Sequence, residues 1–319
     1  MQVAGPAVTL CVALVLSPDL AAPTHGQTSP PPTFSVSADA PATARGSVAL
    51  SPTTGALVRA IPIEVPGFHG IEPRLALSYS SLSSNGFAGV GWALSGFSVI
   101  ERTRNGRGTP RFTPSDVYVL DGQELLPCSQ VPSSPGCVAG GTHATKQESY
   151  TRIKLDTSTS PSTWTVWSRN GVRTELQPVY QAAGGTWRWG QRKVIDTHDN
   201  TVTYAWECSG GDCYPRSVTF GPFAVTVYRE PRPDVLSFAT GGLSGLGKTR
   251  DRLRTIAVTR GSALIRAYAL TYVPSGVTAR SLLQSVQQHG TNASVDPASG
   301  QVSGEALIPP QVFAYQGAE

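Results

Sequence analysis

Short runs of β-branched and aromatic residues recur along the chain from Arg45 onward, separated by turn-forming glycine, proline or asparagine. In the stretch TWTVWSRNGVRTEL, two such runs flank Arg169-Asn170-Gly171. Asn-Gly is a strong hairpin signal because both residues tolerate the positive φ of a tight β-turn. A second pair of runs surrounds a polar turn at His198-Asp199-Asn200. This spacing predicts a mainly β fold, in which many short antiparallel strands and hairpins form a shell-like or sandwich-like domain.

The composition agrees with a fold that has few helices. Glycine (33) and proline (26) are abundant, and both interrupt helices. The segment ARSLLQSVQQHG (279–290) is compatible with either a short helix or a strand. The net charge is +4, but the arginines are dispersed along the chain. We therefore expect scattered, solvated charge and no nucleic-acid-binding face.

The first residues have the pattern of an export signal. The apolar run Val8–Leu16 is too short to span a bilayer but suits the core of a secretory signal peptide. Residues 1–26 are predicted to be this signal, and residues 27–44, rich in Pro, Ser and Ala, a disordered leader. The β domain is then expected over 45–319, in a secreted or extracellular protein without a stable membrane span.

Four cysteines follow the predicted signal: Cys128, Cys137, Cys208 and Cys213. An even number in an exported chain favours disulfides, and four cysteines allow three pairings. The local pairs Cys128–Cys137 and Cys208–Cys213 would each close a loop rich in Gly, Pro and Ser. A zinc site is the alternative, but it usually has C-x2-C spacing, which is absent here. We therefore expect disulfides and leave their connectivity open.

The stretch GGLSGLGKT (241–249) matches the phosphate-binding pattern G-x-x-x-x-G-K-[ST] through Gly242, Gly247, Lys248 and Thr249. A working phosphate loop needs a helix after it, so that the helix N-terminus faces the phosphate. The sequence continues as RDRLRTIAVTRG, whose alternation and β-branched residues favour a strand. We therefore interpret the stretch as a glycine-rich connection between strands and expect no nucleotide.

Other catalytic patterns are incomplete. Ser158–Ser160 resembles one element of ADP-ribosyltransferases, but no Glu-x-Glu pair accompanies it. His198 lies between Asp196 and Asp199, where a polar hairpin turn is favoured over a metal or acid–base site. The histidines have no metal-binding spacing, and no G-x-S-x-G elbow is present. The sequence therefore predicts no cofactor, no metal and no enzymatic activity.

The most distinctive stretch is NGFAGVGWALSGFSVIER (Asn85–Arg102). Its glycines do not form a dinucleotide fingerprint, because Leu94 stands where the third glycine would be. Gly89 and Gly91 instead suggest a tight crossing of two backbone segments, with Trp92 filling the gap beside them. This interpretation makes the stretch architectural.

These residues carry a resemblance to a known family. A strand run ending in Leu77–Tyr79 precedes Gly-x-Gly-Trp-x-Leu at Gly89–Leu94, then Arg111–Phe112 and Ser115–Leu120. In this order they resemble the start of virulence plasmid B proteins of the SpvB/TcaC type. They are equally similar to the N-terminal part of the B component of insecticidal toxin complexes. The motif positions are Gly89, Gly91, Trp92, Arg111, Asp116 and Tyr118, and the resemblance covers about residues 45–316.

The resemblance implies a role for the chain as part of something larger. In toxin complexes, the similar region begins a β-rich shell that YD-type (RHS) repeats and a C component complete around a toxic segment. A β-propeller usually follows the region, and in SpvB-type proteins a separate C-terminal domain carries the ADP-ribosyltransferase. The expected partners are therefore a downstream propeller or YD-repeat shell, or a toxin C-type chain. Some family members also reach the host cytoplasm.

Three hypotheses follow for function. The first is a non-catalytic scaffold module of a secreted toxin-like protein, whose tryptophans are mostly core or inter-strand contacts. The second is a stand-alone extracellular module that binds carbohydrate or protein through exposed aromatic residues of the 164–189 hairpins. The third is an enzyme of an unrecognised class. Exposed tryptophan pairs would favour the second hypothesis, and a cleft with convergent carboxylates the third.

Overall fold

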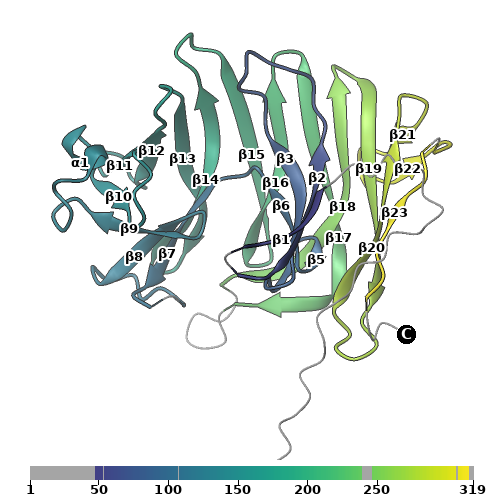
Figure 1. Cartoon of the computed structure of the whole chain (residues 1–319), viewed down its shortest axis with the longest axis horizontal. Coiled ribbons are helices and arrows are strands. Elements are labelled where there is room, and N and C mark those ends of the chain that lie inside the picture. Colours follow the sequence, from purple (N-terminus) through teal and green to yellow (C-terminus); the bar gives the residue numbers. More distant parts are fainter. Residues whose placement is uncertain (1–46, 53, 107, 239–245, 307, 316–319) are drawn as a thin grey trace, which may run out of the picture. The chain divides into compact units, whose positions relative to one another are not determined.

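The structure is a computed structural model that describes residues 47–52, 54–106, 108–238, 246–306 and 308–315. All of these residues belong to one compact unit. They form three groups of strands, which we call the barrel, the meander and the small sheet (Figure 1). None of the helices in the described ranges is long and apolar enough to cross a membrane. Because almost all of the described elements are strands, the fold is mainly β, as the sequence predicts.

The barrel consists of eight antiparallel strands, each paired with its sequence neighbour and closed by pairing of the first strand with the last. Closure removes the unpaired edges that an open sheet presents. One short helix lies in the connection between its third and fourth strands. The elements are β7 (Val99–Arg104), β8 (Asp116–Leu120), β9 (Gln123–Pro127), α1 (Pro135–Val138), β10 (His143–Thr145), β11 (Arg152–Asp156), β12 (Thr163–Trp167), β13 (Arg173–Ala182) and β14 (Gly185–Ile195).

The meander continues from the barrel as consecutive antiparallel strands joined by short turns. Long strands rich in Val, Thr and Tyr are typical of such a sheet. Its strands are β15 (Thr201–Ser209), β16 (Asp212–Phe220), β17 (Phe223–Ser237), β18 (Lys248–Arg260), β19 (Ala263–Pro274), β20 (Ser281–His289) and, at the edge, β23 (Gln311–Val312). The segment 281–289, for which sequence left helix and strand open, is therefore a strand.

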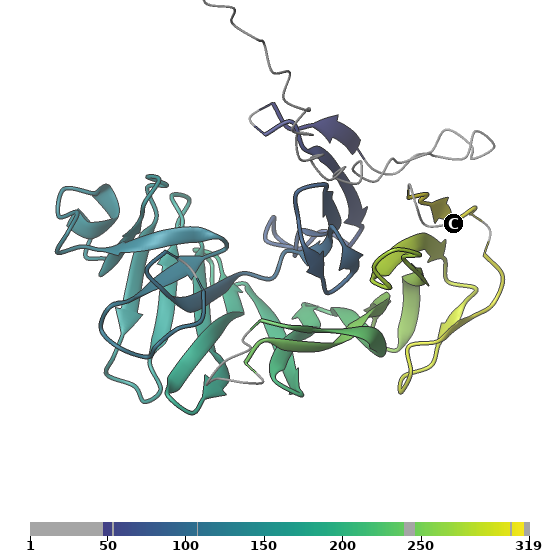
Figure 2. The ribbon, with the colours of Figure 1, turned by 90° about the horizontal axis from the view of Figure 1, so that it is seen from below.

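The small sheet faces the meander (Figure 2). Its strands are β1 (Ser47–Leu50), β2 (Leu57–Ile63), β3 (Leu75–Ser80) and β6 (Trp92–Ser95). Two short hairpins accompany the sheets: β4 (Asn85–Gly86) with β5 (Gly89–Val90), and β21 (Ser294–Val295) with β22 (Val302–Ser303). In β3, burial alternates along the strand, so that Leu75, Leu77 and Tyr79 all point into the core as their sequence pattern predicts.

Two large hydrophobic cores stabilise these groups of strands. One lies between the small sheet and the meander and contains fully buried residues such as Leu77, Val218 and Ile256. The other fills the barrel and includes Ile100, Leu125, Ile153, Trp164, Leu176 and Trp189. Full burial of one large apolar side chain contributes about 1.5–3 kcal/mol. The barrel interior is thus occupied by side chains.

Strand β14 joins the barrel to the meander. One edge of β14 pairs with β13 along its length. The other edge pairs with β7 over Arg188–Gly190 and then with β15 over Lys193–Ile195. Gln191 lies between the two partners, and its backbone N–H donates to the Ser98 carbonyl at 2.9 Å. A single strand therefore belongs to both groups.

The hairpins predicted from sequence are present. Asn170-Gly171 forms the turn between β12 and β13, and Gly171 has a φ of +80°. The polar turn at 198–200 joins β14 to β15. The helix α1, which the sequence did not indicate, is a single turn inside a disulfide-closed loop. The predicted signal peptide and leader, residues 1–44, lie outside the described residues.

Candidate functional site

The glycine–tryptophan motif lies where three chain segments meet. Gly89 has a φ of +96°, and a Cβ there would lie 2.8 Å from the carbonyl oxygen of Ser281. Gly91 has a φ of +76°, and its Cβ would lie 2.4 Å from the Tyr79 ring. Both positions therefore need glycine for backbone conformation and for space. The tight crossing inferred from sequence has this geometry.

Trp92 ties the small sheet to the chain beyond β23. Its side chain is 1% exposed, and its Nε1–H donates to the Tyr315 hydroxyl at 3.0 Å. The Tyr315 hydroxyl in turn donates to the carbonyl of Leu283 at 2.9 Å. The Trp92 ring packs 5.3 Å from that of Tyr79 and 4.9 Å from that of Phe313, measured between ring centroids. These contacts make Trp92 part of the core.

A buried ion pair stands beside this motif. The side chains of Arg232 and Asp234 are 0% and 5% exposed, and Arg232 Nε lies 3.0 Å from Asp234 Oδ1. Arg232 also donates to the Gly86 carbonyl and to Asn85 Oδ1. Asp234 accepts from Asn85 Nδ2 and from the backbone N–H and hydroxyl of Ser281. The pair therefore links β17, β20 and the β4–β5 hairpin.

Burial by itself would raise the pKa of the Asp234 carboxyl. The hydrogen bonds from Arg232, Ser281 and Asn85 outweigh that effect and hold this pKa far below its usual value. Asp234 thus stays ionised at any physiological pH. This pair was not among the residues predicted from the sequence.

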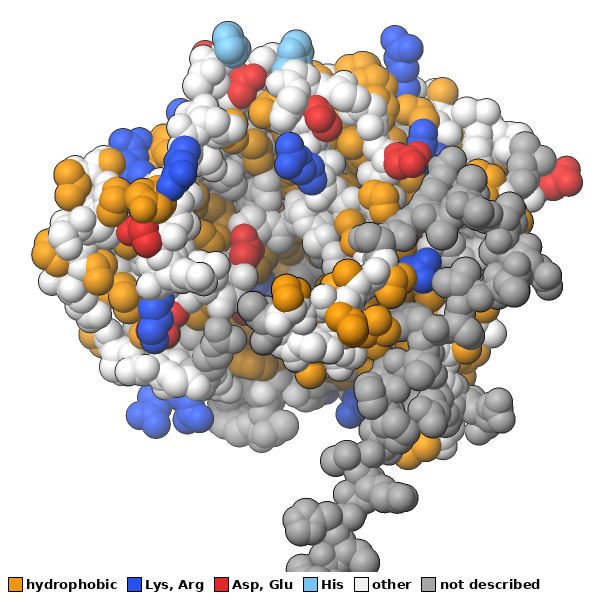
Figure 3. All heavy atoms as spheres, in the orientation of Figure 1, with side chains coloured by type: hydrophobic (Ala, Val, Ile, Leu, Met, Phe, Trp, Pro, Cys, Tyr) orange, Lys and Arg blue, Asp and Glu red, His pale blue; other side chains and the backbone are white. Residues whose placement is uncertain are grey.

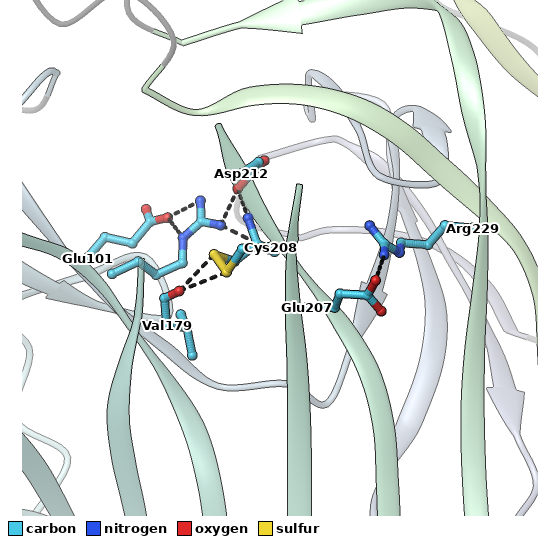
Figure 4. The surroundings of a disulfide bond; sticks show 8 residues. Glu101, Val179, Glu207, Cys208, Asp212 and Arg229 are labelled. Atoms are coloured by element: carbon cyan, nitrogen blue, oxygen red, sulfur yellow. Dashed lines mark hydrogen bonds and ion pairs between the residues drawn. A yellow bond between two sulfur atoms is a disulfide. The ribbon is translucent and has the colours of Figure 1, made fainter. Parts of the chain in front are cut away.

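A second charged cluster lies at the junction of barrel and meander, around Arg188 of β14. Its guanidinium donates to Glu101 Oε1 from Nε at 2.8 Å and to Asp212 Oδ1 from Nη1 at 2.6 Å. Figure 4 shows Glu101 and Asp212 approaching this one guanidinium from two sides. Asp212 also accepts from the Thr249 hydroxyl at 2.7 Å and from the Cys213 N–H at 2.8 Å. Burial alone would lower the pKa of Arg188, but Asp212 and Glu101 raise it.

The disulfide Cys208–Cys213 closes the β15–β16 hairpin next to this cluster. Val179 has no partner in the β13–β14 register, so it forms a β-bulge between Pro178 and Tyr180. Its carbonyl oxygen lies 2.8 Å from both sulfurs (Figure 4). A disulfide sulfur has no hydrogen to donate, so these are close contacts and not hydrogen bonds. They bring the bulge of the barrel against the hairpin of the meander.

The other disulfide, Cys128–Cys137, closes the loop that contains α1. Both bonds are the local pairs that the sequence analysis named among three possible connectivities. Within the described residues, no group of His, Cys, Asp and Glu is arranged to hold a metal ion.

The remaining motif residues lie on the barrel. Asp116 has a buried side chain, 1% exposed, and accepts from Arg102 Nε at 2.9 Å. It also accepts from the backbone N–H groups of Arg111 and Thr113, so it fixes the turn before β8. Tyr118 packs against the rings of Trp164, Trp189 and His143. Arg111 contributes its backbone N–H and has an exposed side chain.

The tryptophans of the 164–189 hairpins are largely buried. Trp164, Trp187 and Trp189 are 0%, 3% and 2% exposed. Trp167 and Trp206 are half-buried; Arg152 stacks on Trp167, and Trp206 donates to the Gln191 carbonyl. An exposed aromatic platform for carbohydrate needs several open ring faces, which these side chains do not offer.

The motifs discounted in the sequence have structural roles. Lys248 and Thr249 lie in β18, which follows the glycine-rich stretch as a strand and not as a helix; residues 239–245 are outside the described ranges. His198 is exposed in a turn that the Asp196 carboxylate fixes by accepting from the His198 and Asn200 N–H groups. Ser158 donates from its backbone N–H and its hydroxyl to the Asp156 carboxylate in another turn.

On the face of the molecule shown in Figure 3, basic and acidic side chains are interspersed.

Comparison with known proteins places this architecture in a family. The family model for the Salmonella virulence plasmid 65kDa B protein, SpvB, matches residues 51–209, about half of the chain. The chain belongs to the SpvB family. The matched range contains the whole barrel, most of the small sheet, and every motif position from Gly89 to Tyr118.

Relatives of this SpvB-family chain include the mono(ADP-ribosyl)transferase SpvB of Salmonella typhimurium, 27% identical over 178 residues, covering 48% of this chain and 30% of that protein. The same enzyme of Salmonella choleraesuis is 26% identical over 200 residues, covering 54% and 33%. The match thus spans about a third of the length of these relatives.

Solved structures share the fold at low sequence identity. The N-terminal domain of effector protein SpvB from Salmonella typhimurium has a TM-score of 0.59 at 16% identity, covering 72% of this chain and 98% of that one. The Photorhabdus luminescens Tc holotoxin pore has a TM-score of 0.59 at 18% identity, covering 83% of this chain and 16% of that one. The SpvB-family chain is therefore a toxin-related module.

Proposed function

We propose that this SpvB-family module is a non-catalytic scaffold: a rigid β framework within a secreted toxin-type protein. The observation that carries the proposal is that the most distinctive residues of the sequence make structural contacts within the fold. Gly89, Gly91 and Trp92 build a close crossing of chain segments, and the buried charges of Arg232 and Asp234 neutralise each other. Groups of this kind hold strands in place and leave no reactive side chain poised at a substrate.

The comparisons support a modular role. The solved SpvB N-terminal domain is covered over 98% of its length, so the matching fold stands as a domain of its own in that protein. The Tc structures contain the same fold as 16% of a much longer chain. We propose that the partners of this module are a downstream propeller or YD-repeat shell, or a toxin C-type chain. We further propose that it acts outside the cell that makes it, in virulence or effector encapsulation.

A labelling experiment tests the non-catalytic proposal. The full chain is incubated with labelled NAD+ and host-cell lysate, with the mono(ADP-ribosyl)transferase SpvB of Salmonella typhimurium as positive control. We expect label on protein in the control and none above a heat-denatured blank with this chain. Transfer of label by the chain, lost on denaturation, would refute the proposal.

A further inference from the structure

The structure contains a pocket at the barrel–meander junction that the scaffold role does not use. It has a volume of about 240 Å³ and lies between β6, β7, β14, β15, β16 and β18. Small-molecule sites usually have about 300–1,000 Å³, so this pocket suits one side chain better than a cofactor. Its walls include four aromatic residues: Phe87, Phe97, Trp206 and Tyr214.

The rings form two contacting pairs in the pocket wall. Phe87 packs against Tyr214 with ring centroids 5.3 Å apart, and Phe97 against Trp206 at 5.8 Å. Phe87, Phe97 and Trp206 are half-buried, so each keeps some ring surface open. Aromatic faces carry negative electrostatic potential and attract organic cations.

The charged wall of the pocket has an excess of one negative charge. It holds the guanidinium of Arg188 and the carboxylates of Glu101 and Asp212. Each nitrogen of Arg188 already has a partner within this cluster, and both oxygens of Asp212 accept hydrogen bonds. These contacts and the Cys213 carbonyl account for four of the five N–H groups of Arg188, so little of its donor capacity is left for an anionic ligand.

The Glu101 carboxylate is less fully paired than that of Asp212. Its side chain is 37% exposed, and among the described residues only its Oε1 atom accepts hydrogen bonds. Figure 4 shows the second carboxylate oxygen turned away from the guanidinium. The pocket thus combines a carboxylate oxygen that accepts no hydrogen bond from the described residues with partly exposed aromatic rings.

We propose that this pocket binds a basic side chain, an arginine in preference to a lysine, presented by a protein partner. The partner's cation would balance the excess charge and donate to Glu101 Oε2, and its aliphatic stem would pack against the aromatic rings of the wall. A planar guanidinium stacks on aromatic faces better than an ammonium group does. This inference adds a binding site to the framework and does not depend on the proposed absence of catalysis.

Blocked amino acids test the site on the full chain. Nα-acetyl-arginine amide is titrated into protein with 15N-labelled tryptophan, which gives one indole signal for each of the six tryptophans. The Trp206 signal, assigned with Trp206→Phe, should shift saturably with a Kd on the order of 1 mM. The signal of Trp164, which is buried in the barrel, serves as internal control. The lysine amide should bind more weakly, and Nα-acetyl-citrulline amide, an uncharged analogue, should leave Trp206 unshifted.

Three variants sharpen the test. Glu101→Gln should weaken arginine amide binding about five-fold or more, while Glu175→Gln, which changes another arginine-paired and half-exposed carboxylate, should not. If Glu101→Gln loses the dispersed indole signals of the folded chain, Ala93→Leu replaces it, since Ala93 is an exposed residue of the pocket wall without charge.

Several results would overturn the inference: equal shifts with citrulline amide or glutamate amide, unchanged affinity in both Glu101→Gln and Ala93→Leu, or a Trp206 signal that no basic ligand moves. Methylguanidinium binding as tightly as the arginine amide would also contradict it, because that ion lacks the stem that the rings should hold. None of these outcomes bears on the labelling experiment with NAD+.

Discussion

Substitution of Asp234 by asparagine is the sharpest perturbation that the fold offers. The Asp234 carboxylate accepts five hydrogen bonds: two from Arg232, two from Ser281 and one from Asn85, at 2.5–3.1 Å. The substitution Asp234→Asn preserves the shape but removes the charge and turns an amide N–H2 toward these donors. The fully buried Arg232 guanidinium then loses its counter-ion. Removing one member of a buried ion pair costs about 3–5 kcal/mol, which is the loss of unfolding free energy we expect.

Urea unfolding followed by tryptophan fluorescence measures this loss. Glu175→Gln is the matched control, because it breaks the partly exposed Arg173–Glu175 pair and should cost no more than about 1 kcal/mol. A loss of less than about 1 kcal/mol in Asp234→Asn would refute the argument that the buried pair holds β17, β20 and the β4–β5 hairpin together.

The same carboxylate makes a prediction about pH. The folded-state pKa of Asp234 lies below its unfolded value of about 3.9. Its contribution to stability is therefore fully present above that unfolded value and is lost as the pH falls through the depressed folded value. The difference in unfolding free energy between wild type and Asp234→Asn should be constant from pH 5 to 8 and shrink only under strongly acidic conditions. A difference that shrinks between pH 7 and 5 would contradict this assignment.

Three further predictions use other parts of the fold. Gly91→Ala should lower the free energy of unfolding in urea by about 2–5 kcal/mol, because alanine is strained at this positive φ and its Cβ would overlap the Tyr79 ring. The control Gly55→Ala, where φ is +66° and the space is open, should cost about 1–2 kcal/mol. Equal losses in the two variants would contradict the close crossing. Replacing Cys208 and Cys213 together by serine should lower the free energy of unfolding by about 2 kcal/mol, which is the loop-closure contribution of a disulfide that closes so short a loop. An unchanged melting temperature in this variant would refute the prediction. Burial lowers the pKa of His143 to about 4. The free energy of unfolding should therefore fall by about 3 kcal/mol as the pH drops from 6.5 to 4, because over this range the unfolded state binds the proton more strongly than the folded state. His143→Phe should remove most of this pH dependence, whereas His198→Gln, which changes an exposed histidine, should keep it.

Local sequence predicted much of the fold because its signals are local. Asn170-Gly171 fixes a hairpin whatever the rest of the chain does, and the alternation of Leu75, Leu77 and Tyr79 identifies the inward face of β3. Glycine at 89 and 91 beside a tryptophan indicated a close crossing, although the partner carbonyl at Ser281 is far away in sequence.

What the sequence did not reveal depends on distant strands. Glu101, Arg188 and Asp212 meet only because β7, β14 and β16 become neighbours at the junction, and no spacing in the sequence encodes that. Closure of the barrel could not be predicted from the sequence either. It depends on pairing between β7 and β14, which are the first and last strands of the barrel and lie far apart along the chain. The buried pair offered one signal: Arg232 and Asp234 lie two residues apart in a strand and share one face of it.

The double use of strand β14 sets an order of events during synthesis. Val99–Glu101 of β7 must wait for Arg188–Gly190 of β14, so the barrel can close only after the ribosome has added the residues between them. Until then, successive hairpins from β7 to β13 carry two open edges. The same strand then receives β15 at Lys193–Ile195, directly after the closing contacts. Barrel closure and the start of the meander are therefore separated by about eleven residues of translation, from Gly190 to Thr201. A pause just before β14 would prolong the exposure of both edges.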